Sequence, residues 1–201
     1  MKVLVIGGSG FVGSHIADQF SKNGHEVTIF DKKESLWLRK DQKIIIGDLQ
    51  NESNLKKAIY NANVVCHFAA LSDIEDALNK PIETVNENIL GTVKVLELCC
   101  KYKIKKFIHA SSVYANSSEG GFYGSSKRAS EDYIEEYSKR NGLDYTILRF
   151  GTIYGERSDI TNGVTRIILN AIKTGKVVYF GNKESVREYV HVLDVAKACI
   201  Q

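Results

Sequence analysis

The stretch KVLVIGGSGFVG, from Lys2 to Gly13, determines how the rest of the chain is organised. Residues 2–6 have the apolar content of a buried β-strand, and residues 11–20 repeat apolar side chains at helical spacing. The glycines follow the pattern G-x-x-G-x-x-G, at Gly7, Gly10 and Gly13. In a strand, turn and helix of this kind, the free N–H groups of the helix N-terminus favour phosphate. We assign Gly7 to the turn, Gly10 to the approach of the backbone to phosphate, and Gly13 to the packing of helix on sheet.

Acidic or small residues follow three further predicted strands. Asp31 comes after the second strand, about 20 residues beyond the glycines, where a carboxylate accepts hydrogen bonds from the ribose of adenosine. Asp48 and Leu49 follow the third strand, and the Asp48 carboxylate can reach the amino group of adenine there. Phe68, Ala69 and Ala70 follow the fourth strand and leave room for a cofactor. Together with the glycine turn, these residues predict a dinucleotide site at one edge of the sheet.

Apolar strands alternate with amphipathic helices over most of the chain. This alternation is typical of an α/β fold with a doubly wound, mostly parallel Rossmann sheet. Strands are expected at 2–6, 26–30, 43–46, 64–68, 106–109 and 144–148. Helices are expected at 11–23, 52–60, 82–102 and 123–141.

The alternation is lost after residue 155. A polar loop at 156–163 precedes an expected helix at 164–173, a short strand at 177–180, and a helical pattern at 192–201 that has no cap. We therefore expect a dinucleotide-binding Rossmann domain at 1–155 and part of a smaller substrate-binding region at 156–201, the remainder being absent. Since the cofactor half is then complete and the substrate half is not, we expect dinucleotide binding with poor turnover.

Composition and charge exclude several classes of function. Of the 201 residues, 43% are hydrophobic and 25% charged, and the net charge of +3 is spread along the chain, so no nucleic-acid partner is expected. The longest apolar runs are too short to cross a membrane, and a cytoplasmic protein without membrane contact is expected. The four cysteines form no C-x-x-C pair, which predicts neither a disulfide framework nor a metal site.

Side chains suited to proton transfer follow the fifth strand. Ser111 and Ser112 end this strand, and Tyr123 and Lys127 are four residues apart, on one face of a predicted helix. A tyrosine has an ordinary pKa of about 10, too high for a base at neutral pH, and a nearby ammonium group lowers it. A serine hydroxyl at the strand end can hold a substrate oxygen. Beside a dinucleotide, these groups predict a centre that moves protons next to a nicotinamide ring.

With these residues in place, the chain resembles the extended short-chain dehydrogenases/reductases, specifically the NAD-dependent epimerase/dehydratase family that acts on nucleotide sugars. The resemblance covers essentially the whole chain in order. The motifs that carry it are GGSGFVG at 7–13, Asp31, GDL at 47–49, HFAA at 67–70, NILGT at 88–92, SS at 111–112, YGSSK at 123–127, LRFGTIYG at 148–155 and REYVHVLDVAKA at 187–198.

The resemblance implies a role for each motif residue. Tyr123 is the base that takes a proton from a sugar hydroxyl, Lys127 tunes it and holds the nicotinamide ribose, and Ser112 binds the reacting oxygen, with Ser111 as the alternative. The substrate contacts are Ser111, Ser112, Thr152 and Arg187, of which Arg187 binds the substrate phosphate, as its forked guanidinium suits a diphosphate. The implied NAD contacts are Gly7, Gly10, Phe11, Val12, Gly13, Asp31, Lys32, Asp48, Leu49, Phe68, Ala69, Ala70, Asn88, Tyr123 and Lys127.

The leading hypothesis is NAD-dependent epimerisation of a nucleotide sugar through a keto intermediate. The alternatives are a 4,6-dehydratase, a nucleotide-sugar reductase, and an inactive NAD-binding protein. Dehydratases of this kind carry Asp-Glu where this chain has Val113 and Tyr114, which argues against that alternative.

We expect NAD rather than NADP because Asp31 repels a 2′-phosphate. The resemblance also implies a homodimer that pairs the helices at 82–102 and 123–141.

Overall fold

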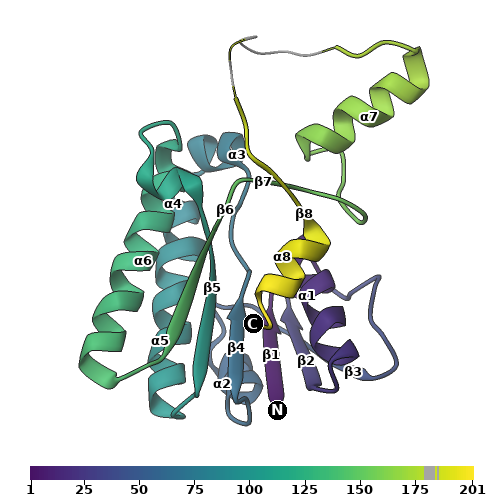
Figure 1. Cartoon of the computed structure of the whole chain (residues 1–201). Helices are drawn as coiled ribbons and strands as arrows, with labels where there is room; N and C mark the ends of the chain where they lie inside the picture. The colour runs from purple at the N-terminus through teal and green to yellow at the C-terminus, as the bar shows by residue number, and fades with distance from the viewer. Residues whose placement is uncertain (179–183, 185) are drawn as a thin grey trace.

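The computed structural model describes residues 1–178, 184 and 186–201, and it has a parallel sheet at its centre (Figure 1). Six strands pair in the order β3-β2-β1-β4-β5-β6. Their bounds are β1 Lys2–Ile6, β2 Glu26–Asp31, β3 Gln42–Ile46, β4 Val64–His67, β5 Lys106–Ser112 and β6 Tyr145–Phe150. The strand order reverses between β1 and β4, and ligands bind at the carboxyl ends of the strands beside such a reversal. The expected doubly wound Rossmann sheet is confirmed.

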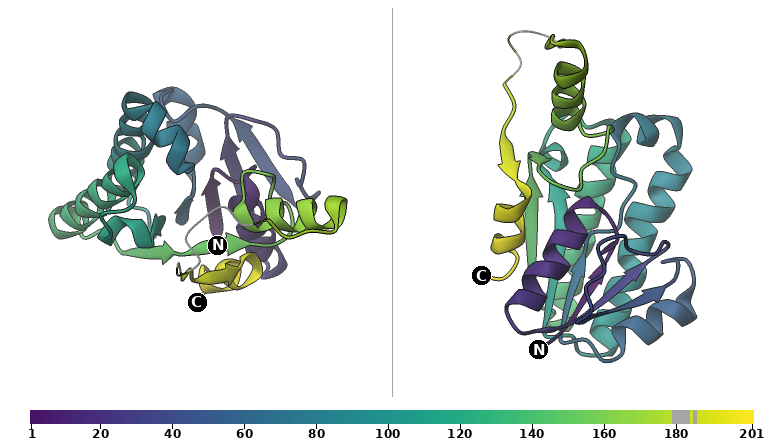
Figure 2. Two further views of the ribbon diagram at one scale, coloured as in Figure 1. Left: turned by 90° about the horizontal axis from the view of Figure 1, so that it is seen from above. Right: turned by 90° about the vertical axis from the view of Figure 1, so that its right-hand side faces the viewer.

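Helices cover both faces of this sheet (Figure 2). Those that complete its two cores are α1 Phe11–Lys22, α2 Glu52–Ile59, α5 Gly91–Lys101, α6 Gly121–Asn141 and α8 Val192–Ala198. Successive side chains of a strand point to opposite faces. Accordingly, Leu4 and Ile6 of β1 pack in the core formed with α2, α5 and α6, and Val3 and Val5 pack in the core formed with α1 and α8.

The segment expected as one helix at 82–102 is divided into three parts. A short helix, α4 Pro81–Thr84, leads into the π-helical segment η1 Val85–Leu90, and α5 follows. Two further elements were not expected, the helix α3 Ile74–Asn79 and the 3₁₀ turn η2 Val113–Asn116. The Asp73 side chain caps α3 by accepting a 2.9 Å hydrogen bond from the Asp76 amide, so a start signal was present in the sequence.

The chain after β6 departs from the sheet and then returns to it. Strand β7 Thr152–Tyr154 pairs in parallel with β8 Tyr189–His191, and α7 Gly163–Thr174 extends away from the sheet between them (Figure 1). Residues 177 and 178 form no strand, and the rest of the expected strand at 177–180 lies outside the described residues. The final helix ends at Ala198, earlier than expected, and packs with α1. Within the described ranges, no helix is both long and apolar enough to span a membrane.

Candidate active site

A cavity of about 740 Å³ opens at the carboxyl edge of the sheet, where the sequence places the candidate residues. Its wall includes the glycine turn, the ends of β2 and β5, the loop after β4, and the first turn of α6. The predicted site residues that line it are Gly7, Gly10, Phe11, Val12, Gly13, Asp31, Lys32, Leu49, Phe68, Ala69, Ala70, Ser111, Ser112, Tyr123 and Lys127. The predicted residues that the structure places outside this wall are Asp48, Asn88, Thr152 and Arg187.

The glycine turn forms a cradle that has no space for side chains. Gly7 has a φ of +82°, and a Cβ atom there would lie 2.5 Å from the amide nitrogen of Ala69. A Cβ atom on Gly13 would lie 2.2 Å from the carbonyl oxygen of Gly7. Gly10 begins α1 without a side-chain cap, so the amides of the first turn have no partner from a capping side chain. These features fit the pyrophosphate of a dinucleotide, which the helix N-terminus favours electrostatically.

Asp31 is held at the cavity wall by two backbone amides. Its carboxylate accepts hydrogen bonds from the Ser9 amide at 3.0 Å and from the Lys33 amide at 3.1 Å. The second of these comes from the same loop that carries Lys32, and the first ties Asp31 to the glycine turn. The carboxylate therefore has a fixed position beside the cradle, as an acceptor for ribose hydroxyls requires.

Lys32 is occupied by two carboxylates. Its ammonium nitrogen lies 2.7 Å from Glu87 and 3.4 Å from Asp48. Partial burial disfavours the charged form, but the hydrogen bonds and charges of Glu87 and Asp48 outweigh it and raise the pKa of Lys32. Asp48 thus pairs with Lys32 and lies outside the cavity wall, and its contact with adenine stays a prediction. Leu49, its neighbour, does line the cavity and is buried.

Asn88 supports the cavity wall from behind. Its side-chain amide exchanges hydrogen bonds with both backbone groups of Leu71, at 2.8 and 3.0 Å, and donates to the Ser126 hydroxyl at 2.9 Å. Asn88 is 2% exposed and belongs to η1. All of its polar side-chain atoms therefore have partners within the protein, and the contact of Asn88 with the cofactor stays a prediction.

The three predicted catalytic side chains meet at the cavity. Tyr123 and Lys127 lie on the first turns of α6, with the ammonium nitrogen 5.8 Å from the centre of the tyrosine ring. The Ser112 side chain lies close enough to the Tyr123 hydroxyl to lower its pKa, and it also accepts a 3.2 Å hydrogen bond from the Tyr114 amide. Lys127 donates a 2.8 Å hydrogen bond to the Ala110 carbonyl oxygen, which fixes α6 to the end of β5.

The pKa values of this pair differ from the simple expectation. Burial raises the pKa of Tyr123, the hydrogen bond with Ser112 opposes this shift, and Tyr114 adds to it. Burial also lowers the pKa of Lys127 to about 8, against the opposing charge of Glu131. Lys127 is not among the groups that set the pKa of Tyr123 here, because its ammonium group is directed to Ala110, and its tuning of Tyr123 stays a prediction.

Glu131 is a buried acid that the sequence analysis missed. It accepts a short hydrogen bond from the Ser111 hydroxyl, and Arg149 contacts both of its oxygens, the shorter bond being 2.6 Å. Burial favours the neutral acid, but these hydrogen bonds and the charge of Arg149 lower the pKa of Glu131. Ser111 is thus committed to Glu131, and Ser112 is the serine that contacts Tyr123. The four-residue spacing of Tyr123, Lys127 and Glu131 was the signal available in the sequence.

The two remaining substrate candidates lie outside the cavity wall. Thr152 belongs to β7, and its neighbours Gly151 and Ile153 line the cavity in its place. Arg187 donates to the Tyr114 hydroxyl at 3.4 Å, beside the turn that follows Ser112. The structure adds lining residues without a sequence signal, among them Ser158, Asp159, Thr161 and Asn162.

Comparisons with known proteins agree with this geometry. The family model described as "NAD dependent epimerase/dehydratase family" matches residues 3–201. A putative UDP-glucose 4-epimerase of Methanocaldococcus jannaschii is 32% identical over 98% of this chain and 71% of its own length. The chain belongs to the NAD-dependent epimerase/dehydratase family, and its cofactor is NAD.

Two solved structures are similar to the whole chain. The UDP-glucose 4-epimerase of Thermotoga maritima, solved with UDP-glucose, has a TM-score of 0.90 at 30% identity and is covered over 72% of its length. The UDP-glucose 4-epimerase of Thermus thermophilus, solved with NAD, has a TM-score of 0.88 at 29% identity and is covered over 73%. Each match covers 100% of this chain.

Proposed function

We propose that the chain catalyses the NAD-dependent epimerisation of a nucleotide sugar through a keto intermediate. The observation that carries this proposal is that Ser112, Tyr123 and Lys127 share one cavity with the glycine cradle and Asp31. The relatives named as UDP-glucose 4-epimerases support the same class of reaction.

The chain's own residues hold NAD at three points. The amides at the start of α1 would donate hydrogen bonds to the pyrophosphate, the Asp31 carboxylate would accept them from the adenosine ribose, and Lys127 would bind the nicotinamide ribose. When bound, NAD supplies a reversible acceptor for the hydride of the sugar carbon. The small side chains of Ala69 and Ala70 keep the cavity open between these points.

Proton transfer is the task of Tyr123 and Ser112. When the sugar carbon is oxidised, the Tyr123 phenolate would take the proton of the hydroxyl on that carbon. The Ser112 hydroxyl would hold the reacting oxygen. Tyr123 would return the proton to this oxygen when the carbon is reduced on its other face. Because burial raises the pKa of Tyr123, forming the phenolate requires positive charge near its oxygen in the loaded site.

We further propose that residues 156–201 contribute the substrate-binding region beside a cofactor domain at 1–155. The loop at 158–162 lines the cavity, and Arg187 lies beside the turn after Ser112, where it can reach a diphosphate by a change of rotamer. Helix α8 supports this region from the sheet, because Ala196 and Cys199 pack in the core with α1.

A panel of UDP- and dTDP-sugars, followed by proton NMR and by NADH absorbance, tests the proposal. We expect a 4-epimer with no net NADH, formed at the slow rate that the sequence analysis predicts. Stoichiometric NADH would instead identify a reductase working in reverse, and a 4-keto-6-deoxy sugar would identify a dehydratase. NAD binding without turnover of any sugar would favour the inactive NAD-binding alternative.

We also propose a homodimer formed by α6 and the η1–α5 segment. The fold divides the apolar side chains of these helices between two sides: Leu96 and Ile134 are fully buried in the sheet-facing core. Val85, Leu90 and Tyr133 remain 50%, 41% and 46% exposed on the outer side. These outer side chains are the candidates for contact with a second copy.

A further inference from the structure

An ion pair outside the cavity joins the loop after β7 to helix α1. The Arg157 guanidinium lies 2.7 Å from the Asp18 carboxylate, and the two side chains are only 18% and 12% exposed. The other oxygen of Asp18 accepts a 3.1 Å hydrogen bond from Gln42 at the start of β3. Arg157 and Asp18 are 139 residues apart in the sequence. The pair therefore connects the last part of the chain to the helix whose first turn forms the phosphate cradle.

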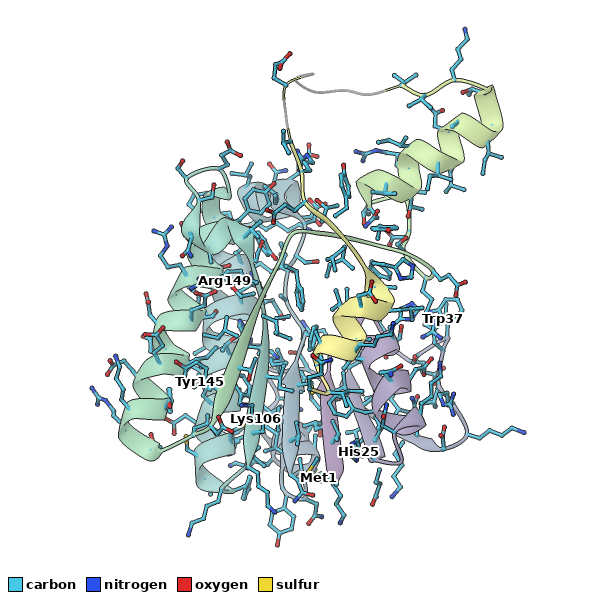
Figure 3. All side chains as sticks on the ribbon, viewed as in Figure 1. Met1, His25, Trp37, Lys106, Tyr145 and Arg149 are labelled. Atoms are coloured by element: carbon cyan, nitrogen blue, oxygen red, sulfur yellow. The ribbon has the colours of Figure 1, made fainter. Side chains whose placement is uncertain are left out.

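Arg157 makes a second contact with the N-terminal part of the chain. Its guanidinium lies 4.9 Å from the ring centre of Trp37, which comes from the segment between β2 and β3 and is labelled in Figure 3. Such stacking of a cation on an indole face is attractive. One guanidinium nitrogen, Nη1, is buried and has no hydrogen-bond partner among the residues that the structure describes. The backbone of Arg157 has a φ of +68°, which is uncommon for a residue other than glycine.

A residue keeps a strained backbone and a buried charge only where its surroundings fix it. Here the fixed segment is the loop that follows, because Ser158, Asp159, Thr161 and Asn162 line the NAD cavity while Arg157 does not. The preceding residue is fixed as well: the His15 ring on α1 donates a 3.0 Å hydrogen bond to the carbonyl oxygen of Glu156. The loop is thus anchored to α1 at two consecutive residues before it reaches the cavity.

We propose that Arg157 is a positioning residue for cofactor binding. By pairing with Asp18 and stacking on Trp37, it holds the loop at 158–162 as a wall of the NAD cavity. Loss of the ion pair then releases this wall and weakens NAD binding, although neither Arg157 nor Asp18 lines the cavity. The inference rests on the NAD site alone and not on which sugar is the substrate.

The chain provides its own reporter, since Trp37 is its single tryptophan. In Arg157→Gln, acrylamide quenching of Trp37 fluorescence should increase, because the guanidinium no longer covers the indole. By calorimetry, Arg157→Gln and Asp18→Asn should each weaken NAD binding by roughly five- to tenfold. The double variant should be no weaker than either single variant, because both substitutions remove the same contact. Saturating NAD should in turn protect Trp37 from acrylamide in the unchanged protein, since coupling is reciprocal.

Two controls separate positioning from general stability. Arg166→Gln removes an exposed arginine of α7 and should leave both NAD affinity and quenching unchanged. Arg157→Lys keeps the charge, so it should recover part of the NAD affinity. It also replaces Arg157→Gln in the test if the glutamine variant does not fold.

Unchanged NAD affinity in a folded variant would overturn the proposal, as would unchanged quenching or additive effects of Arg157→Gln and Asp18→Asn. A merely structural role would lower the thermal midpoint without changing NAD affinity. Because NAD binding is measured without sugar, failure of the epimerase assay would not affect this test.

Discussion

The ammonium nitrogen of Lys127 lies 2.8 Å from the carbonyl oxygen of Ala110, so the catalytic helix α6 is hydrogen-bonded to the end of strand β5. The same strand carries Ser112, which lies close enough to Tyr123 to lower its pKa. The bond between Lys127 and Ala110 therefore fixes the helix of the proposed base against the strand that carries this serine.

Tyr123→Phe should abolish epimerisation and retain most of the NAD affinity, since the other NAD contacts remain. The substitution removes only the hydroxyl that exchanges the proton, and loss of general-base catalysis typically costs about 10²- to 10⁴-fold in rate. Turnover by NMR and NAD binding by calorimetry measure the two effects. Tyr60→Phe, at a tyrosine 63% exposed and outside the cavity wall, is the control and should retain full turnover. Substantial turnover by Tyr123→Phe would remove Tyr123 from the mechanism.

Glu131→Gln should shift the alkaline side of the pH–rate profile to lower pH. Burial lowers the pKa of Lys127 to about 8, and the negative charge of Glu131 opposes this shift. Without that charge, Lys127 loses its proton at lower pH, so activity at pH 8 should fall more than activity at pH 6.5. Asp132→Asn changes an exposed acid next in sequence and should leave the profile in place. A uniform fall at every pH would mean that Glu131 acts only on stability.

Asp31→Ala should narrow the preference for NAD over NADP. In the unchanged protein, Asp31 is held by the Ser9 and Lys33 amides and repels a 2′-phosphate, while Lys32 is committed to Glu87 and Asp48. We expect the dissociation constant of NADP divided by that of NAD to fall by roughly tenfold, which corresponds to about 1.4 kcal/mol of binding free energy. Titration with each dinucleotide measures it. Tighter binding of NADP by the unchanged protein would contradict this assignment of Asp31.

The buried histidines below the cavity should make stability depend on pH. Burial lowers the pKa of His67 to about 3 and holds the pKa of His109 well below its ordinary value, and the charge of Lys127 adds to both shifts. As pH falls below about 6.5, the unfolded chain binds protons that the folded chain does not. The free energy of unfolding should therefore decrease, by about 1.4 kcal/mol per pH unit for each histidine.

His109→Phe tests this dependence. Within the described part of the chain, neither ring nitrogen of His109 has a hydrogen-bond partner, and its ring already stacks on Phe107, so a phenyl ring suits the site. Urea unfolding between pH 7.5 and 5 measures how steeply the free energy of unfolding falls with pH. In the variant this slope should be smaller than in the unchanged protein, by the amount that one proton bound on unfolding contributes. His25→Gln, at a partly exposed histidine, should leave the buried pair's contribution in place. An unchanged slope in His109→Phe would show that another group controls the acid response.

Tyr133→Glu should separate the proposed homodimer. Helix α6 packs against η1, so their exposed apolar side chains belong to one surface. The substitution places a charge on that surface. Sedimentation equilibrium should show a dimer for the unchanged protein and a monomer for the variant. Tyr60→Glu adds the same charge at a different surface and should remain dimeric. A monomer for the unchanged protein at high concentration would contradict the dimer.

The sequence by itself determined the parts of this protein that depend on neighbouring residues. Alternation and apolar spacing predict the six strands of the sheet and most of its helices, because a strand or helix buries one face at a fixed period. The glycine pattern at 7–13 predicts the cradle, since only glycine fits where a Cβ atom would meet backbone. Tyr123 and Lys127 are found because four residues bring side chains to one face of a helix.

The tertiary structure alone decided the contacts between distant segments. The split of the helix at 82–102 places Asn88 against the loop after β4, Ser111 is committed to Glu131, and Arg157 reaches Asp18 across 139 residues. Local periodicity cannot indicate these pairs, since a buried acid or arginine has the same sequence signal as a solvated one. Their partners are chosen when the sheet brings strand ends and helices together, because a charge removed from water is retained only where an opposite charge or a hydrogen bond meets it.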